Sequence, residues 1–142
     1  MTSSEHQNPL YLNLELELGP GSEAIRLLEL LPGTGDGPVE ARLFCVQKPQ
    51  DRPYEALSYT WGAKVKSRTI QVNGQLVHVN DNLFNALVSL RLEDRSRTLW
   101  VDALCINQKD NAEKQAQVAM MGTIYHETDT VLIFLGMPTA QS

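Results

Sequence analysis

One stretch of the chain combines residue types that could perform chemistry. The run Leu99–Gln108 is apolar except for Asp102 in its middle and Asn107 and Gln108 at its end. Because a lone buried carboxylate is costly, Asp102 must be paired, lie at a strand end or serve a function. Polar residues between a strand and a helix occupy the place where open α/β sheets bind their ligands. We therefore expect a ligand-binding or catalytic site here.

Asp102 and Asn107 each allow two interpretations. Asp102 could hold a ribose or act as a catalytic carboxylate, or it could be a structural side chain bonded to Arg95, Arg97 or backbone amides. Asn107 could bind a ligand through its side-chain amide, or it could close the turn before the next helix. The sequence leaves both alternatives open.

Glu113 follows Asp110 by three residues, the spacing of a capping box at a helix start. This spacing explains Glu113 as a helix cap, and the competing hypothesis is a catalytic carboxylate. The free N–H groups and positive dipole end of that helix would suit a phosphate. A serine or cysteine hydrolase is poorly supported, because Cys105 lies within an apolar run and the chain has no Gly-x-Ser-x-Gly elbow.

A second group of candidate residues follows the short predicted strand Ala56–Tyr59. Trp61 beside Gly62 could offer a ring on which nicotinamide or adenine stacks, or it could be a corner tryptophan that plugs the core. Ser58 could bind a ribose or a phosphate, or it could be a buried serine bonded to the backbone. Loops at the carboxyl ends of parallel strands meet at one sheet edge. We expect Trp61 to share a cleft there with Asp102, Asn107 and the helix start at Asp110.

The elements that position these residues alternate between strands and helices from Tyr54 onward. Such alternation predicts right-handed crossovers and a parallel sheet, in which the three single strands listed below (the first, fourth and last segments) are neighbours. Leu57, Trp100, Leu132 and Phe134 should be buried in it. The predicted segments are a strand at Ala56–Tyr59, a hairpin at Arg68–Val79 turning at Asn73-Gly74, a helix from Asn80 or Asp81 to about Arg91, a strand at Thr98–Ile106, a helix from Asp110 to about His126 with Val118, Met121 and Tyr125 at core spacing, and a buried strand at Thr130–Leu135.

Three further strands are predicted before Tyr54. Leu10–Leu18 alternates leucine with polar residues, which indicates a half-buried strand, and Ile25–Leu31 and Val39–Gln47 are apolar runs of strand length. With the hairpin, these segments would extend the edges of the sheet or form a small second sheet.

Composition limits the class of protein. The chain has 142 residues, enough for one domain, and a formal net charge of −5, which gives no electrostatic footprint for nucleic acid or an anionic membrane. Its apolar runs are shorter than a membrane span, and Met1–Pro9 lacks the pattern of a signal peptide, so we expect a cytoplasmic protein. Cys45 and Cys105 have no metal-ligand spacing and are predicted to be reduced core thiols, without a metal.

Several blocks in one order resemble the fungal heterokaryon-incompatibility (HET) domain. The resemblance covers residues 25–136, which leaves residues 1–24 as an N-terminal extension with a possible edge strand and residues 137–142 as a tail. HET domains usually continue further, so we expect the N-terminal part of a longer chain or a short variant. The blocks are Ile25–Gly33, Tyr54–Gly62, Leu99–Gln108, Gln117-Val118 with Met121 and Ile124-Tyr125, and Val131–Gly136.

The resemblance implies a cell-death module that acts after non-self recognition, through self-association and NLR-type or other incompatibility partner proteins. It also implies a mostly parallel, flavodoxin-like sheet flanked by helices, similar to Toll/interleukin-receptor (TIR) domains, many of which cleave NAD. Among the residues singled out above by their own chemistry, Asp102 and Glu113 are then the catalytic candidates, and Ser58, Trp61, Gly62 and Asn107 are the candidates for binding NAD. No residue matches the glutamate that TIR-like enzymes carry on the helix after the third strand. The alternative to an NAD-cleaving effector is a non-catalytic adaptor domain.

Overall fold

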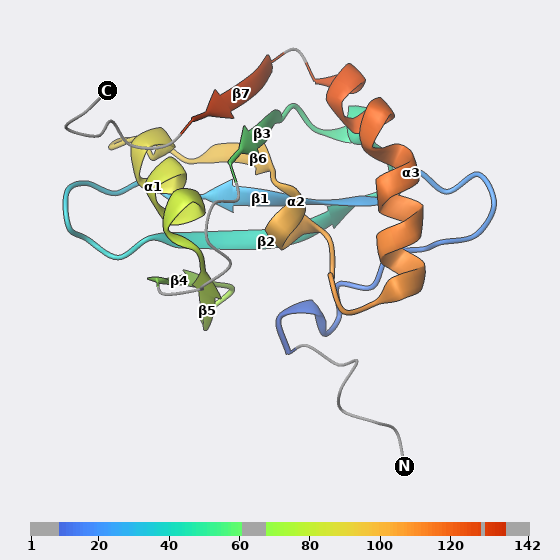
Figure 1. The fold of residues 1–142 in the computed structure, drawn as a ribbon, viewed down its shortest axis with the longest axis horizontal. Coiled ribbons are helices and arrows are strands. Elements are labelled where there is room, and N and C mark those ends of the chain that lie inside the picture. Colours follow the sequence, from blue (N-terminus) through green and yellow to red (C-terminus); the bar gives the residue numbers. More distant parts are fainter. Residues whose placement is uncertain (1–8, 61–67, 129, 136–142) are drawn as a thin grey trace.

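The computed structural model describes residues 9–60, 68–128 and 130–135. Within them the chain forms one mixed sheet with helices packed against it, and Figure 1 shows α1 and α3 near opposite ends of the strands. The elements are 3₁₀ turns at Pro9–Tyr11 and Pro49–Asp51, strands β1 (Ile25–Leu30), β2 (Glu40–Val46), β3 (Glu55–Tyr59), β4 (Arg68–Val72), β5 (Gln75–Val79), β6 (Arg97–Trp100) and β7 (Thr130–Phe134), and helices α1 (Asp81–Leu90), α2 (Asp102–Cys105) and α3 (Asn111–Glu127).

The seven strands lie in the order β5-β4-β2-β1-β6-β3-β7. The predicted parallel core is confirmed, because β3 lies between β6 and β7 and pairs with both in parallel. Leu57 and Trp100 are fully buried there, and Leu132 and Phe134 are partly buried. The N-terminal strands join this core in the antiparallel sense, since β1 pairs with both β6 and β2. The whole sheet is therefore mixed rather than mostly parallel.

The hairpin β4–β5 forms as its turn sequence predicts. Asn73 and Gly74 both adopt positive φ, at 53° and 78°, which is the conformation of a two-residue hairpin turn. The register pairs Ile70 with Val77 and Arg68 with Val79. The Asn73 side chain also exchanges two hydrogen bonds with the backbone of Leu43, which fastens the hairpin to β2.

The predicted strand over Leu10–Leu18 is wrong. The segment begins with a 3₁₀ turn that buries Leu10 and Tyr11 and continues without regular structure, with Leu12 and Leu18 exposed. Alternating leucines favour a strand only where a neighbouring strand is free to pair with them. Here β1 already has β2 and β6 on its two sides.

Two later elements also differ from prediction. The predicted strand Thr98–Ile106 ends at Trp100, and the rest of that run becomes the single turn α2. The β7 strand is not buried on both faces, because among the described residues it lies at the edge of the sheet and leaves Val131, Ile133 and Leu135 exposed. Val118 is likewise exposed on α3, and Ile124 is the apolar residue of that helix that is buried. No helix in the described ranges is long and apolar enough to cross a membrane.

Candidate functional site

The candidate site lies where the chain passes from β6 through α2 to the start of α3. Cys105 and Ile106 donate backbone hydrogen bonds to Val101 and Asp102, which close the turn of α2. Asn107 then ends this turn, because its Oδ1 accepts the N–H of Lys109 at 3.2 Å. The turn-closing interpretation of Asn107 is therefore confirmed, although its amide nitrogen is left available.

A buried ion pair fixes the start of α3. Arg26 on β1 and Glu113 on α3 are 1% and 3% exposed, and Nη1 and Nη2 of Arg26 lie 2.6 and 2.8 Å from the two carboxylate oxygens. Glu113 also accepts the N–H of Asn107 at 2.6 Å. Burial alone would lower the pKa of the Arg26 guanidinium, but the hydrogen bonds and charge of Glu113 raise it. The Arg26 guanidinium therefore keeps its charge, and its bonds to Glu113 tie β1 to the start of α3.

Side chains from the N-terminal region also hold α2 in place. The hydroxyl of Tyr11 donates to the carbonyl of Leu104 at 2.7 Å, and Arg26 donates to the carbonyl of Cys105 at 3.1 Å. The Tyr11 ring lies 4.6 Å from the guanidinium carbon of Arg26, within cation–π distance. Since the last carbonyls of a helix have no partners within it, these contacts supply the missing donors.

The capping box predicted at α3 forms only in half. Asp110 is the N-cap, and its carboxylate accepts the N–H of Glu113 at 3.1 Å. The Glu113 side chain does not return this bond to Asp110 but points to Arg26 and Asn107. The sequence spacing is thus compatible with a cap, but a stronger partner 87 residues away takes the carboxylate.

Asp102 begins α2 and is half-buried. Burial raises the pKa of its carboxyl group, and hydrogen bonds from the N–H groups of Ala103 and Asp102 itself lower it in part. The predicted alternatives Arg95 and Arg97 are engaged elsewhere, with Asp94 and Glu55. Backbone amides are therefore the partners of Asp102, and within the described ranges it forms no ion pair.

A cavity of about 320 Å³ opens beside Asn107. Its walls come from the 3₁₀ turn at Pro9–Tyr11, the end of β3, β5, the start of α1, α2 and the first turn of α3. Burial and the charge of Asp102 raise the pKa of Tyr59, which lines it. The lining residues are Leu10, Tyr11, Tyr59, Val77, His78, Val79, Asn80, Leu83, Ala103, Leu104, Asn107, Gln108, Lys109 and Lys114.

Sequence comparison identifies the family of this chain. A model of the heterokaryon incompatibility protein (HET) family matches residues 54–142. The chain belongs to the HET family. It is also 35% identical over 144 residues to "Heterokaryon incompatibility protein 6, OR allele" of Neurospora crassa, which covers 84% of this chain and 20% of the relative. The chain thus spans about a fifth of that relative's length. No solved structure matches the chain.

In this HET chain the predicted site residues do not all come together. Asn107 lines the cavity, whereas the side chain of Asp102 is not among the lining residues. Glu113 lies in the core, and Ser58 is exposed beside Ile133 on the pairing of β3 with β7, so the prediction of a buried serine is wrong. Trp61 and Gly62 lie outside the described residues, so a shared cleft with Trp61 stays a prediction.

The two cysteines differ from each other. Cys105 is buried as expected, and burial raises the pKa of its thiol to about 12, so it stays protonated and is a poor nucleophile. Cys45 is exposed, contrary to the prediction of a core thiol, and its Sγ lies 3.3 Å from the carbonyl oxygen of Leu14. Among the described residues no group of three or more acidic, histidine or cysteine side chains is arranged to hold a metal ion.

Sequence reasoning missed Arg26, Tyr11 and the two lysines of the cavity. An arginine inside the apolar strand Ile25–Leu30 is a usable signal, because a buried charge must find a partner. The alternating leucines place Tyr11 in a predicted strand, and nothing local in the sequence points to its contact with α2. Lys109 and Lys114 flank the start of α3, and only the fold brings them to the same cavity as β5 and α1.

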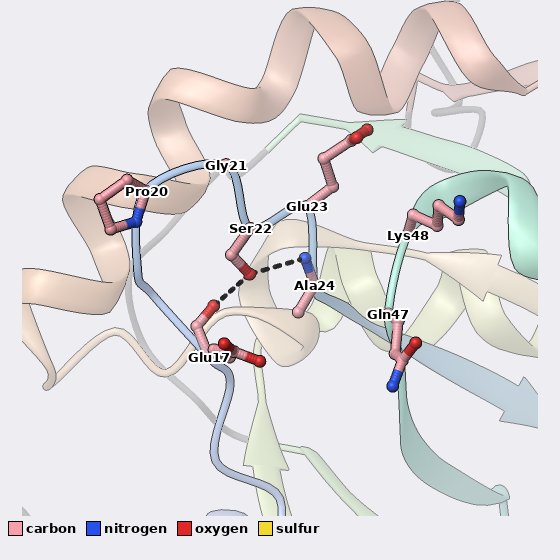
Figure 2. A pocket seen from close by; sticks show the side chains of 8 residues that line it. All are labelled: Glu17, Pro20, Gly21, Ser22, Glu23, Ala24, Gln47 and Lys48. Atoms are coloured by element: carbon pink, nitrogen blue, oxygen red, sulfur yellow. Dashed lines mark hydrogen bonds between the residues drawn. The ribbon is translucent and has the colours of Figure 1, made fainter.

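A second hollow, of about 400 Å³, lies at the loop before β1 (Figure 2). Ser22 closes this loop, because its hydroxyl donates to the carbonyl of Glu17 at 2.5 Å and accepts the N–H of Ala24 at 3.4 Å. In Figure 2 the Glu17 carboxylate lies apart from the Glu23 carboxylate and the Lys48 ammonium, and no ion pair among the described residues joins these three groups. The hollow is therefore a loop that satisfies its own polar groups, and we assign no ligand to it.

Proposed function

We propose that this chain is an effector domain of fungal heterokaryon incompatibility, which causes programmed cell death after non-self recognition in the cytoplasm. Membership of the HET family carries this proposal, and the name of the Neurospora crassa relative supports it. The test is induced expression of the chain in a fungal host, with viable colonies counted against an empty vector. Loss of viability is expected. Normal growth with soluble chain present at a high level would contradict an effector role.

Cleavage of NAD after self-association is the mechanism that we propose for this effector. Asp102 supports it as the candidate acid, since it is half-buried, has a raised pKa and forms no ion pair in the described residues. Perturbed carboxylates of this kind concentrate at functional sites. Glu113 is the second catalytic candidate, although its ion pair with Arg26 favours a structural role. Ser58, Trp61, Gly62 and Asn107 remain the proposed NAD-binding residues.

Nicotinamide release from NAD by the purified chain tests this mechanism. Asp102→Asn should abolish release while leaving the fold intact, because asparagine keeps an acceptor for the backbone N–H groups. Asp94→Asn is the matched control, since Asp94 is 76% exposed in a loop and lies away from α2. Equal release by both variants would remove Asp102 from the mechanism, and no release by the wild-type chain would favour the adaptor alternative.

A non-catalytic adaptor is the second candidate function, and the edge strand β7 favours it. Thr130–Phe134 contains no charge and no proline, and Ile133 is 70% exposed. Natural edge strands usually carry charges or proline that prevent pairing with another chain. Light scattering against protein concentration tests the idea with Ile133→Lys and with Leu76→Lys, a control on β5 that is also 70% exposed. An adaptor that associates through β7 loses association only with Ile133→Lys.

A further inference from the structure

The cavity beside Asn107 carries a charge pattern unlike that of the whole chain. The formal net charge of the chain is −5, yet none of the described aspartates and glutamates lines this cavity, whereas Lys109 and Lys114 both do. Both lysines are exposed, and neither forms an ion pair within the part of the chain that the structure describes. An anion that enters the cavity therefore meets two positive charges that are not neutralised.

Asn107 supplies a fixed hydrogen-bond donor to the same cavity. Asn107 is only 6% exposed, and its Oδ1 already accepts the N–H of Lys109. This bond sets the orientation of the amide, so the Nδ2 group must be the donor that remains. Nδ2 has no partner among the described residues. Nδ2 is not among the buried polar atoms that lack a partner, so solvent reaches it and it can donate to an acceptor from a ligand.

Part of the cavity wall is apolar, although Tyr11, Tyr59, His78, Asn80 and Gln108 also line it. Val77 and Val79 of β5, Leu83 of α1 and Ala103 of α2 line it. Its volume of about 320 Å³ is at the lower end of the range for small-molecule sites, roughly 300–1,000 Å³. It therefore suits a body of about one nucleotide or a short acyl chain.

We propose that this cavity binds a small amphipathic anion. A phosphate or carboxylate accepts from Asn107 Nδ2 and lies between the ammonium groups of Lys109 and Lys114, while an apolar group packs on Val77, Leu83 and Ala103. Asn107 is also one of the proposed NAD-binding residues, but anion binding in this cavity does not require NAD cleavage, so loss of the one does not entail loss of the other.

NMR titration of the full chain with three probes tests the proposal. Adenosine monophosphate and octanoate each combine an anion with an apolar body, and inorganic phosphate is the anion alone. We expect saturable shifts of the amides of Val77, Ala103 and Lys109 with one or both amphipathic probes at millimolar concentration, and weaker binding of phosphate. Shifts with adenosine monophosphate identify a nucleoside phosphate as the ligand class, and shifts with octanoate identify an acyl carboxylate.

Variants separate specific binding from non-specific attraction. Joint replacement of Lys109→Gln and Lys114→Gln should weaken binding by about tenfold or more, because a charge-assisted contact is lost. Lys48→Gln, at the loop in Figure 2, is the matched control and should bind as the wild type. Asn107→Asp keeps the acceptor for the Lys109 N–H but replaces the donor with a carboxylate, and should abolish binding. No saturable shift with either amphipathic probe, phosphate binding as tight as theirs, or unchanged binding by the double lysine variant would overturn the proposal.

Discussion

The buried pair of Arg26 and Glu113 makes a sharp prediction about the variant Glu113→Gln. The carboxylate accepts three hydrogen bonds, two from Arg26 and one from the Asn107 N–H. Glutamine preserves the volume but has one oxygen and turns an NH₂ group toward a donor. The guanidinium, which is 1% exposed, then remains as a buried charge without its counter-ion. Removal of one partner from such a pair costs about 3–5 kcal/mol.

This loss is large against the whole stability of a domain, which is about 5–15 kcal/mol. With the urea dependence of small proteins, roughly 1–3 kcal/mol per molar, the unfolding midpoint should fall by at least about 1 M. The assay is urea unfolding followed by tryptophan fluorescence and circular dichroism, whose coincidence checks that unfolding has two states. Asp110→Ala is the control for a lost cap alone and should cost about 0.5–2 kcal/mol.

A double-variant cycle shows whether the effect belongs to the pair. Arg26→Met combined with Glu113→Leu removes both charges, so the combined loss should be clearly smaller than the sum of the two single losses. Recovery will be incomplete, because the carbonyls of Leu14 and Cys105 also lose their donor. The reasoning fails if Glu113→Gln costs no more than Asp110→Ala. Loss of cell killing by Glu113→Gln at unchanged stability would instead establish the catalytic prediction for this residue.

Three further variants test separate parts of the structure. Burial raises the pKa of Asp102 above its ordinary value of 3.8, so the folded state binds this proton more tightly than the unfolded state. The free energy of unfolding therefore falls as the pH rises from 3.8 through the raised pKa. Asp102→Asn should be more stable than the wild type at neutral pH and lose this advantage in acid, as measured by urea midpoints across pH. Gly74→Ala should cost about 1–2 kcal/mol in thermal unfolding, since Gly74 has φ of 78°; no change would mean that the turn is not in this conformation. Gly33→Ala should cost about 1–3 kcal/mol, because its Cβ would lie 2.8 Å from Nη1 of Arg91, a guanidinium held by the carbonyls of Gly35, Gly37 and Pro38; a thermal midpoint equal to the wild type would show that Arg91 moves freely.

Local signals in the sequence were enough for the elements whose partners lie nearby in the chain. The Asn73-Gly74 turn determines the hairpin register, and Asn80 caps α1 by accepting the N–H of Leu83. The parallel neighbours of β3 follow from alternation of strands and helices. The TIR-like arrangement stays a prediction, because a mixed sheet of this kind is compatible with several topologies.

The failures came where a pattern admits more than one structure. Residues 99–106 are almost all apolar, and periodicity cannot distinguish a buried strand from a buried helical turn in such a run. The apolar sequence of β7 predicts a strand buried on both faces. Among the described residues β7 pairs only with β3 at the edge of the sheet, and this position leaves part of it exposed. Arg26 and Glu113 are 87 positions apart in the sequence. An arginine in an apolar strand therefore predicts that a partner exists, but not which residue it is.

The family block Leu99–Gln108 owes its shape to residues outside the span that the family model matches. A helix of four residues is too short to be stable alone, and α2 ends in carbonyls that Tyr11 and Arg26 bind. Both donors precede residue 54, where the match to the HET family begins. The same Arg26 holds Glu113, and Glu113 holds the N–H of Asn107. The backbone of Asn107, a residue that lines the cavity, is therefore held by a chain of contacts that begins in β1, so residues before the matched span help to shape the candidate site.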